Sequence, residues 1–273
     1  MSEKEYLAQK DVKKFINWIT NKLDNNFEHS YFDRKTKIKW ECNSIYNSYE
    51  KYKWQNASFA KNQIKMNVFK NKLRTAYNSE NIQDFSEVCK EILNWGQINN
   101  NYFNNTNSEI LNLFKKAQNY FQSFQLESNY FKNEIILNAG FSKIYSLLFE
   151  DFIIFDSRVS AAICFFIKKY LIEEKANIIP VSLEFQYTEG RAGKRRNPNE
   201  LNSEIVFKKI RTYKQIDNCR VKTYIDYQIN NIKANWLLKK ILKNSESKFN
   251  LIDSENRLRA LEAAFFMIGY QIN

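Results

Sequence analysis

Glycine and proline are scarce in this chain, and their scarcity constrains the fold more than any other feature. The 273 residues include five glycines and two prolines. Folds built from many short strands need these residues at their tight turns, so a sandwich or barrel is disfavoured. The spacing of apolar residues instead indicates helices. The sequence therefore predicts a mainly α protein that is long enough to bury a sizeable core.

Apolar residues recur at helical spacing in four segments, 12–23, 85–93, 110–124 and 258–268. Asp84 and Glu87 have the spacing of a capping box, which predicts that Asp84 begins the second of these helices. Gly269 follows the last segment and is predicted to cap it. Residues 177–187 have strand-like composition with an internal proline, which favours an edge strand or an extended loop.

The rare residues exclude several classes of function. His29 is the only histidine, so no two-histidine metal site can form, and a Ser-His-Asp triad would have to use it. The glycines spell neither the P-loop pattern nor the dinucleotide-binding pattern. The four cysteines include no Cys-x-x-Cys pair, which is typical of reduced structural thiols. We therefore expect no metal and no cofactor.

No segment has the pattern of a signal peptide or of a membrane span. Residues 1–14 are polar and charged. The most apolar stretch, 152–167, is interrupted by Asp156 and Arg158 and is too short to cross a bilayer. These observations predict a soluble cytoplasmic protein that does not bind a membrane, and we expect a monomer.

The net charge of +12 is concentrated in two blocks. Residues 34–75 have a net charge of +9, residues 190–250 have +10, and all other residues together have −7. Binding of such basic surfaces to nucleic acids is favoured because it releases counterions, and the aromatic residues between the charges can stack on bases. Two solvated faces are the alternative interpretation. Two blocks of this size favour a nucleic-acid partner.

Asp156 is the strongest candidate for chemistry. It follows the apolar run 152–155 and stands where a helical pattern begins at Val159. Aspartate is a preferred N-cap, because its carboxylate accepts hydrogen bonds from the first free N–H groups, and the helix dipole favours its charged form. A simple helix cap is one interpretation of Asp156. The other is a charged group in a dry cleft, which the apolar residues around it favour.

The steps SKI at 142–144 and IIFDSRV at 153–159 stand in the order of a hairpin followed by a helix start. In this they resemble the helix-hairpin-helix DNA glycosylase superfamily, most closely its bacterial 8-oxoguanine-glycosylase-like branch. Three further stretches resemble the same branch, at 92–96, 190–198 and 259–270. The likeness extends from about residue 85 to the end. It implies a glycosylase-like helical bundle with a cleft.

The resemblance also implies an activity, the excision of a base from double-stranded DNA by flipping a nucleotide and cutting its N-glycosidic bond. Asp156 matches the catalytic carboxylate of the family. Lys143 matches the hairpin lysine, which forms a Schiff base with the sugar in bifunctional relatives. Gly140 stands alone where the hairpin usually has Gly-x-Gly, and only thirteen residues separate Lys143 from Asp156. These departures favour a monofunctional enzyme that leaves an abasic site.

Contacts with DNA are predicted for a basic segment and for a few further side chains. The predicted DNA ligands are Ser142, Arg158, Arg191, Lys194, Arg195 and Arg196. Trp95 and Trp236 are candidates for lining a base pocket, although aromatic residues at helical spacing more often belong to a core. We expect a basic N-terminal helical region, 1–84, packed closely against a glycosylase-like core, 85–273.

The excised base does not follow from the residues. Because the divergent hairpin departs from ordinary repair enzymes, we favour phage defence against modified cytosine, such as glucosylated hydroxymethylcytosine. Repair of oxidised or alkylated purines is the alternative substrate class. A metal-dependent nuclease that uses Asp156 with the step Glu173-Glu174-Lys175 is a second possible function. A non-catalytic nucleic-acid-binding protein is a third, because residues 190–193 spell the Gly-x-x-Gly of KH loops.

Overall fold

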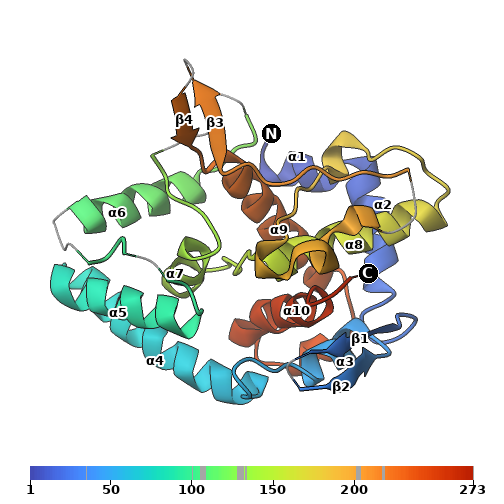
Figure 1. Ribbon diagram of the computed structural model, residues 1–273, viewed down its shortest axis with the longest axis horizontal. Coiled ribbons are helices and arrows are strands. Elements are labelled where there is room, and N and C mark those ends of the chain that lie inside the picture. Colours follow the sequence, from blue (N-terminus) through green and yellow to red (C-terminus); the bar gives the residue numbers. More distant parts are fainter. Residues whose placement is uncertain are drawn as a thin grey trace. The chain divides into compact units, whose positions relative to one another are not determined.

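A computed structural model of the chain (Figure 1) describes residues 1–34, 36–99, 101–104, 109–127, 132, 134–200, 204–216 and 219–272. These residues are mainly helical, which confirms the prediction of a mainly α protein. Each of the four segments with helical spacing lies in a helix, and the first and third helices end a few residues earlier than predicted. Within the described ranges, no helix combines the length and the apolarity that a membrane crossing requires.

The described α-helices are α1 (Glu3–Ala8), α2 (Lys10–Thr20), α3 (Ile45–Glu50), α4 (Phe59–Asn78), α5 (Ile82–Trp95), α6 (Glu109–Gln122), α7 (Phe141–Leu148), α8 (Ser157–Glu173), α9 (Ile225–Lys243) and α10 (Ser254–Ile268). Short 3-10 segments are η1 (Val181–Leu183), η2 (Gly190–Arg196), η3 (Pro198–Glu200) and η4 (Lys248–Leu251). The strands form two antiparallel pairs, β1 (His29–Asp33) with β2 (Ile38–Cys42), and β3 (Tyr213–Ile216) with β4 (Cys219–Lys222).

Packing divides the chain into two compact units. Unit 1 is Met1–Phe59, Asp156–Ile210 and Lys233–Asn273, and unit 2 is Ala60–Phe155 and Arg211–Ile232. This grouping differs from the predicted division after residue 84. The reason is that α2 and α3, near the N-terminus, pack on α8 and α10, so the first part of the chain shares its core with later segments.

Helix α8 forms the centre of unit 1. Twelve of its seventeen residues are buried, in an unbroken run from Val159 to Lys168 that faces the core on every side. Phe166 of α8 packs against Phe265 of α10 with ring centroids 5.0 Å apart, and Tyr170 packs against Phe15 of α2 at 5.6 Å. Gly269 ends α10, as predicted, but with a φ of −75° rather than in the left-handed region.

Aromatic rings from three helices form the core of unit 2. Phe114 of α6 lies 4.9 Å from Phe85 of α5, and it also packs against Phe141 and Tyr145 of α7. All four side chains are fully buried. Because large rings bury more apolar area than any other side chains, this cluster accounts for the close association of α5, α6 and α7.

The capping box predicted at Asp84 is wrong, because α5 begins one turn earlier. Asn81 is the N-cap, and its Oδ1 accepts a hydrogen bond from the N–H of Asp84 at 3.1 Å. The Asn81 Nδ2 donates in return to Asp84 Oδ2 at 2.8 Å. Asp84 therefore lies in the first turn, where the helix dipole favours a negative charge.

The strand considered for residues 177–187 is absent from this described segment, which is an extended loop instead. Pro180 precedes the 3-10 turn η1, in which Val181 is 81% exposed. A single bridge between Tyr187 and Lys209 is its only strand-like pairing. Proline lacks the N–H that a ladder needs, and Pro180 here leads into a 3-10 turn rather than a strand.

Two lysine side chains in the described part of unit 1 are buried, and each donates a hydrogen bond to a carbonyl of a neighbouring loop. Lys168 donates from Nζ to the carbonyl of Pro198 at 2.9 Å, and Lys233 donates to that of Glu184 at 2.7 Å. The Lys233 ammonium also lies 4.6 Å from the centre of the Phe185 ring. Burial lowers the pKa of Lys233 to about 8.

Replacing Lys233 with methionine should change how stability depends on pH. Because the pKa of Lys233 falls from 10.5 to about 8 on folding, the unfolded chain binds more protons in this window, and stability rises with pH there. Relative to Lys233→Met, the free energy of unfolding of the wild type should rise by about 1.5 kcal/mol between pH 8 and pH 9.5. Urea melts at a series of pH values measure the difference, and a difference independent of pH would contradict the lowered pKa.

Candidate functional site

Asp156 caps the N-terminus of α8, as predicted. Its Oδ1 accepts hydrogen bonds from the N–H of Arg158 at 2.9 Å and of Val159 at 3.1 Å. The side chain is half-buried. A carboxylate that accepts two backbone N–H groups at a helix N-terminus is held in one orientation, and the helix dipole stabilises its charge.

The guanidinium of Arg158 lies among three aromatic rings. Its central carbon is 4.0 Å from the ring centre of Phe266, 4.8 Å from that of Tyr270 and 5.6 Å from that of Trp54. Cation–π attraction stabilises such an arrangement. Burial lowers the pKa of Arg158, and the charge of Asp156 opposes this shift. Arg158 therefore sits beside the carboxylate as a caged cation, rather than on an open surface as a predicted phosphate ligand would.

A stack of rings continues from this cage into the β1–β2 pair. Tyr31 lies between Tyr270 and Trp40, with centroids 4.8 and 4.7 Å apart. The hydroxyl of Tyr270 donates to Asp33 at 3.1 Å. The rings that surround the site were not predicted as a group, and they are Tyr31, Trp40, Trp54, Phe266 and Tyr270. They come from three segments of the chain. Phe266 and Tyr270 lie in the stretch 259–270 that resembles the glycosylase branch, and the high aromatic content is the other signal.

The basic segment η2 lies against the first turn of α8. Arg196 donates from Nη1 to the hydroxyl of Ser157 at 2.6 Å. Burial and then the nearby charge of Arg158 lower the pKa of Arg196 to about 10, while Asp156 opposes the shift. Two arginines and one carboxylate thus share a partly desolvated environment.

Gly190 allows this close approach. It has a φ of +56°, and a Cβ at this position would lie 2.6 Å from the hydroxyl of Ser157. Further along η2, Arg195 is half-buried, whereas Arg191 and Lys194 are exposed. Four of the predicted residues are therefore brought together in unit 1, and they are Asp156, Arg158, Arg195 and Arg196.

Lys143 and Ser142 lie in α7, which belongs to unit 2. The ammonium of Lys143 donates to the carbonyl of Ala139 at 2.9 Å, and the side chain is buried. Ser142 is fully buried, and its hydroxyl accepts a hydrogen bond from the N–H of Phe155 at 3.2 Å. Ser142 thus satisfies a buried backbone group in the segment before Asp156 and is not available to DNA, contrary to the prediction.

The two tryptophans considered for a base pocket are buried in the cores of different units. Trp95 of unit 2 donates from Nε1 to Asn62 at 3.0 Å. Trp236 of unit 1 packs against Tyr6 with centroids 5.7 Å apart. These contacts agree with the core interpretation of aromatic residues at helical spacing.

Unit 1 contains an open cavity of about 520 Å³ beside the β1–β2 pair. Its lining is mostly polar and consists of Glu28, His29, Ser30, Lys39, Glu41, Cys42, Asn43, Asn47 and Lys51. The ring of His29 is held by a contact of 2.8 Å between its Nε2 and the carbonyl of Gln271, and burial lowers its pKa. Asp156 and Arg158 do not line this cavity.

The arrangement of α8 argues against the metal-dependent nuclease. Asp156 and Glu173 stand at opposite ends of α8, about 25 Å apart at 1.5 Å per residue, and cannot share one metal ion. Glu173 instead accepts a hydrogen bond from Trp18 at 2.6 Å. The described part of the chain holds no group of three or more side chains suited to a metal.

The KH interpretation also lacks its structural context. The Gly-x-x-Gly step lies in η2, and the neighbouring element is the 3-10 segment η3 rather than the strands and helices of a KH domain. Comparisons with protein-family models, with curated proteins and with solved structures find no match to this chain.

Proposed function

We propose that the protein is a DNA glycosylase that flips a modified base out of duplex DNA and hydrolyses its N-glycosidic bond. The observation that carries the proposal is the Asp156 carboxylate, which two backbone N–H groups hold at the N-terminus of α8 with Arg158 and Arg196 beside it. Cleavage of the bond leaves its electron pair on the base and builds positive charge on the sugar. A fixed, ionised carboxylate stabilises that charge and orients the attacking water.

The basic surroundings of Asp156 suit a polyanionic substrate. Arg191 and Lys194 are exposed on η2, the segment that also contacts the first turn of α8 through Arg196. Phosphate contacts from such side chains position a duplex without reading its sequence. In this proposal η2 holds the backbone of the strand that carries the flipped nucleotide.

The enzyme is proposed to be monofunctional. A Schiff base with the sugar requires a free, neutral amine that reaches the reacting carbon. The Lys143 ammonium is bonded to the carbonyl of Ala139 and its side chain is buried, which argues against this use. Water is then the nucleophile, and the product is an abasic site. The proposed biological substrate is phage DNA with modified cytosine, such as glucosylated hydroxymethylcytosine.

A panel of duplexes tests the activity. Each duplex has an end-labelled strand with one test base, which is cytosine, hydroxymethylcytosine, its glucosylated form, 8-oxoguanine or an alkylated purine. After incubation in EDTA, hot alkali converts abasic sites into strand breaks. We expect breaks in the glucosylated duplex only after alkali, and no covalent adduct with borohydride. Release of a purine lesion alone would show that the enzyme acts on damaged purines in repair rather than on modified cytosine. Release of no base would refute the proposed glycosylase activity.

A further inference from the structure

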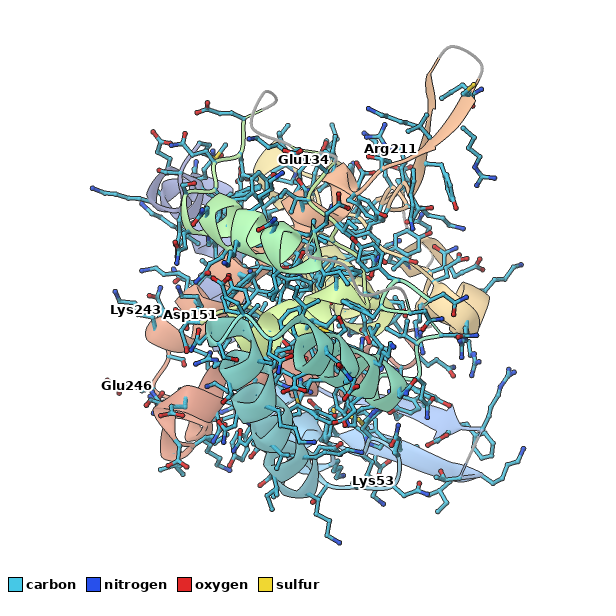
Figure 2. The ribbon with its side chains drawn as sticks, turned by 90° about the vertical axis from the view of Figure 1, so that its left-hand side faces the viewer. Lys53, Glu134, Asp151, Arg211, Lys243 and Glu246 are labelled. Atoms are coloured by element: carbon cyan, nitrogen blue, oxygen red, sulfur yellow. The ribbon has the colours of Figure 1, made fainter. Side chains whose placement is uncertain are left out.

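A second basic feature, which belongs to the basic block 190–250, lies in unit 2. Strands β3 and β4 form a two-stranded ribbon, in which Tyr213 pairs with Lys222 and Gln215 with Arg220. A hydrogen bond from Thr223 to Thr212 extends the ladder by a further step. Neither strand contains an acidic residue. Figure 2 shows the ribbon running outward from the labelled Arg211.

Among the side chains of the ribbon whose burial the structure describes, Val221 is half-buried and the others are exposed. The side chains of Tyr213, Lys214, Gln215, Arg220 and Lys222 are exposed, and Tyr213 is 44% exposed. A two-stranded ribbon that is not covered on either face is marginally stable in water. Contact with a partner that covers its cations and its aromatic ring would therefore stabilise the ribbon.

One face of the ribbon presents groups that are suited to bases. Side chains of paired residues lie on the same face, and so do alternate residues of one strand. Tyr213, Gln215, Arg220 and Lys222 therefore share a face. The guanidinium of Arg220 lies 4.0 Å from the ring centre of Tyr213, which agrees with this assignment. Arginine and glutamine are the side chains that pair with the major-groove edges of guanine and adenine.

The root of the ribbon is anchored to helix α9. Arg211 donates from Nε and Nη2 to the two oxygens of Asp226 at 2.9 and 3.0 Å, and its backbone N–H donates to the same carboxylate at 2.9 Å. This pairing raises the pKa of Arg211. Asp226 is 3% exposed. A bidentate pair with a third hydrogen bond fixes the direction in which the ribbon leaves the unit.

We infer that the β3–β4 ribbon enters the major groove of duplex DNA. The groove is about 12 Å wide and admits a two-stranded ribbon, and its phosphates complement the charges of Lys214, Arg220 and Lys222. The major groove of an RNA duplex is too narrow for such an element. The inference rests on the proposed function for its choice of DNA as the partner, but not on the chemistry at Asp156.

The first test removes the three cations of the ribbon together, in the variant Lys214→Gln/Arg220→Gln/Lys222→Gln. At about 0.1 M salt, its Kd for a duplex should rise by at least about tenfold, and the slope of log Kd against log salt should fall by about 2 to 3. Fluorescence anisotropy at several salt concentrations measures both. These side chains are exposed, so the melting temperature should not change.

The matched control loses the same charge elsewhere in unit 2, in the variant Lys90→Gln/Lys115→Gln/Lys116→Gln on α5 and α6. These lysines lie outside both basic blocks, and the Kd should rise by less than about threefold. If both variants raise the Kd equally, the ribbon contributes only to the general positive charge of the protein, and the inference is overturned. A ribbon variant that binds like the wild type, or that loses affinity for duplex RNA instead, would also overturn it.

The second test places a thiol on the face of the ribbon that carries Tyr213 and Arg220. Cys219 lies on the opposite face, because it alternates with Arg220 along β4, so the variant is Gln215→Cys/Cys219→Ser. Its thiol can exchange with a mixed disulfide tethered to DNA, which releases the small thiol that capped the tether. Duplexes with the tether on an exocyclic amine in the major groove should crosslink several times more than duplexes with a minor-groove tether, and the control variant Cys219→Ser should give no product. Equal or preferential crosslinking to the minor groove would overturn the inference.

The two proposals fail in different ways. If the wild type releases no base while the triple ribbon variant weakens binding and the variant Gln215→Cys/Cys219→Ser crosslinks in the major groove, the glycosylase is wrong and the ribbon inference stands. If base release occurs, but the triple ribbon variant binds DNA like the wild type and crosslinking does not favour the major groove, only the ribbon inference fails.

Discussion

Replacing Asp156 with asparagine should lower the rate of base release by about 1000-fold or more, while the Kd for duplex DNA stays within about twofold. Asparagine is as good an N-cap as aspartate, so the N–H groups of Arg158 and Val159 keep an acceptor and the helix keeps its start. The variant removes the negative charge and little else. The expected loss therefore reports on stabilisation of the sugar cation rather than on folding.

The matched control is Asp253→Asn. Asp253 is also the N-cap of a helix in unit 1, but it is exposed and makes no capping hydrogen bond through its side chain. Single-turnover base release and anisotropy are measured for both variants, on the duplex that gives most product with the wild type. If Asp156→Asn releases base as fast as Asp253→Asn, Asp156 is a structural cap and not the catalytic carboxylate.

Replacing Gly269 with alanine should lower the free energy of unfolding by about 3 kcal/mol or more. A Cβ at this position would lie 1.9 Å from the carbonyl oxygen of Arg158 and 2.6 Å from its carbon. These are backbone atoms in the first turn of α8, so no side-chain rotation relieves the clash. The end of α10 and the start of α8 must move apart, and this movement displaces Arg158 from its cage.

Gly96→Ala is the matched control for Gly269→Ala. Gly96 also ends a helix, with a φ of −72° against −75° for Gly269. Its added Cβ would meet Lys143 at Cδ and Cε, 2.6 and 2.8 Å away, and a flexible side chain yields more easily than backbone. We expect a loss below about 1 kcal/mol for this variant. Urea melts that give equal losses for the two variants would contradict the close approach of α10 to α8.

Periodicity and capping chemistry made much of this fold predictable. The helices α2, α5, α6 and α10 follow from apolar spacing, because a helix that packs on one face records that face in its sequence. The start of α8 at Asp156 follows from the same local rules. The capping box at Asp84 failed because two polar residues three positions apart compete for the same role, and Asn81 wins through its hydrogen bond to the Asp84 N–H.

The surroundings of the candidate site could not be predicted in this way. Tyr31, Trp54 and Tyr270 belong to segments far apart in the sequence, and nothing local marks them as neighbours of Arg158. Ser142 was expected to contact DNA, but it holds the N–H of Phe155. The role of a hydroxyl depends on which unsatisfied group lies next to it, and that is a tertiary property.

The sequence alone determined that the protein is mainly helical, that it is strongly basic, and that an aspartate begins a helix in its middle, since each property depends on residues within a turn or two of one another. Tertiary structure decided the rest. It placed a caged arginine and a basic segment beside that aspartate, buried the lysine and serine of α7, and left the β3–β4 ribbon exposed. Those outcomes depend on which distant surfaces pack together, because packing decides which polar groups lose water and which stay exposed to solvent.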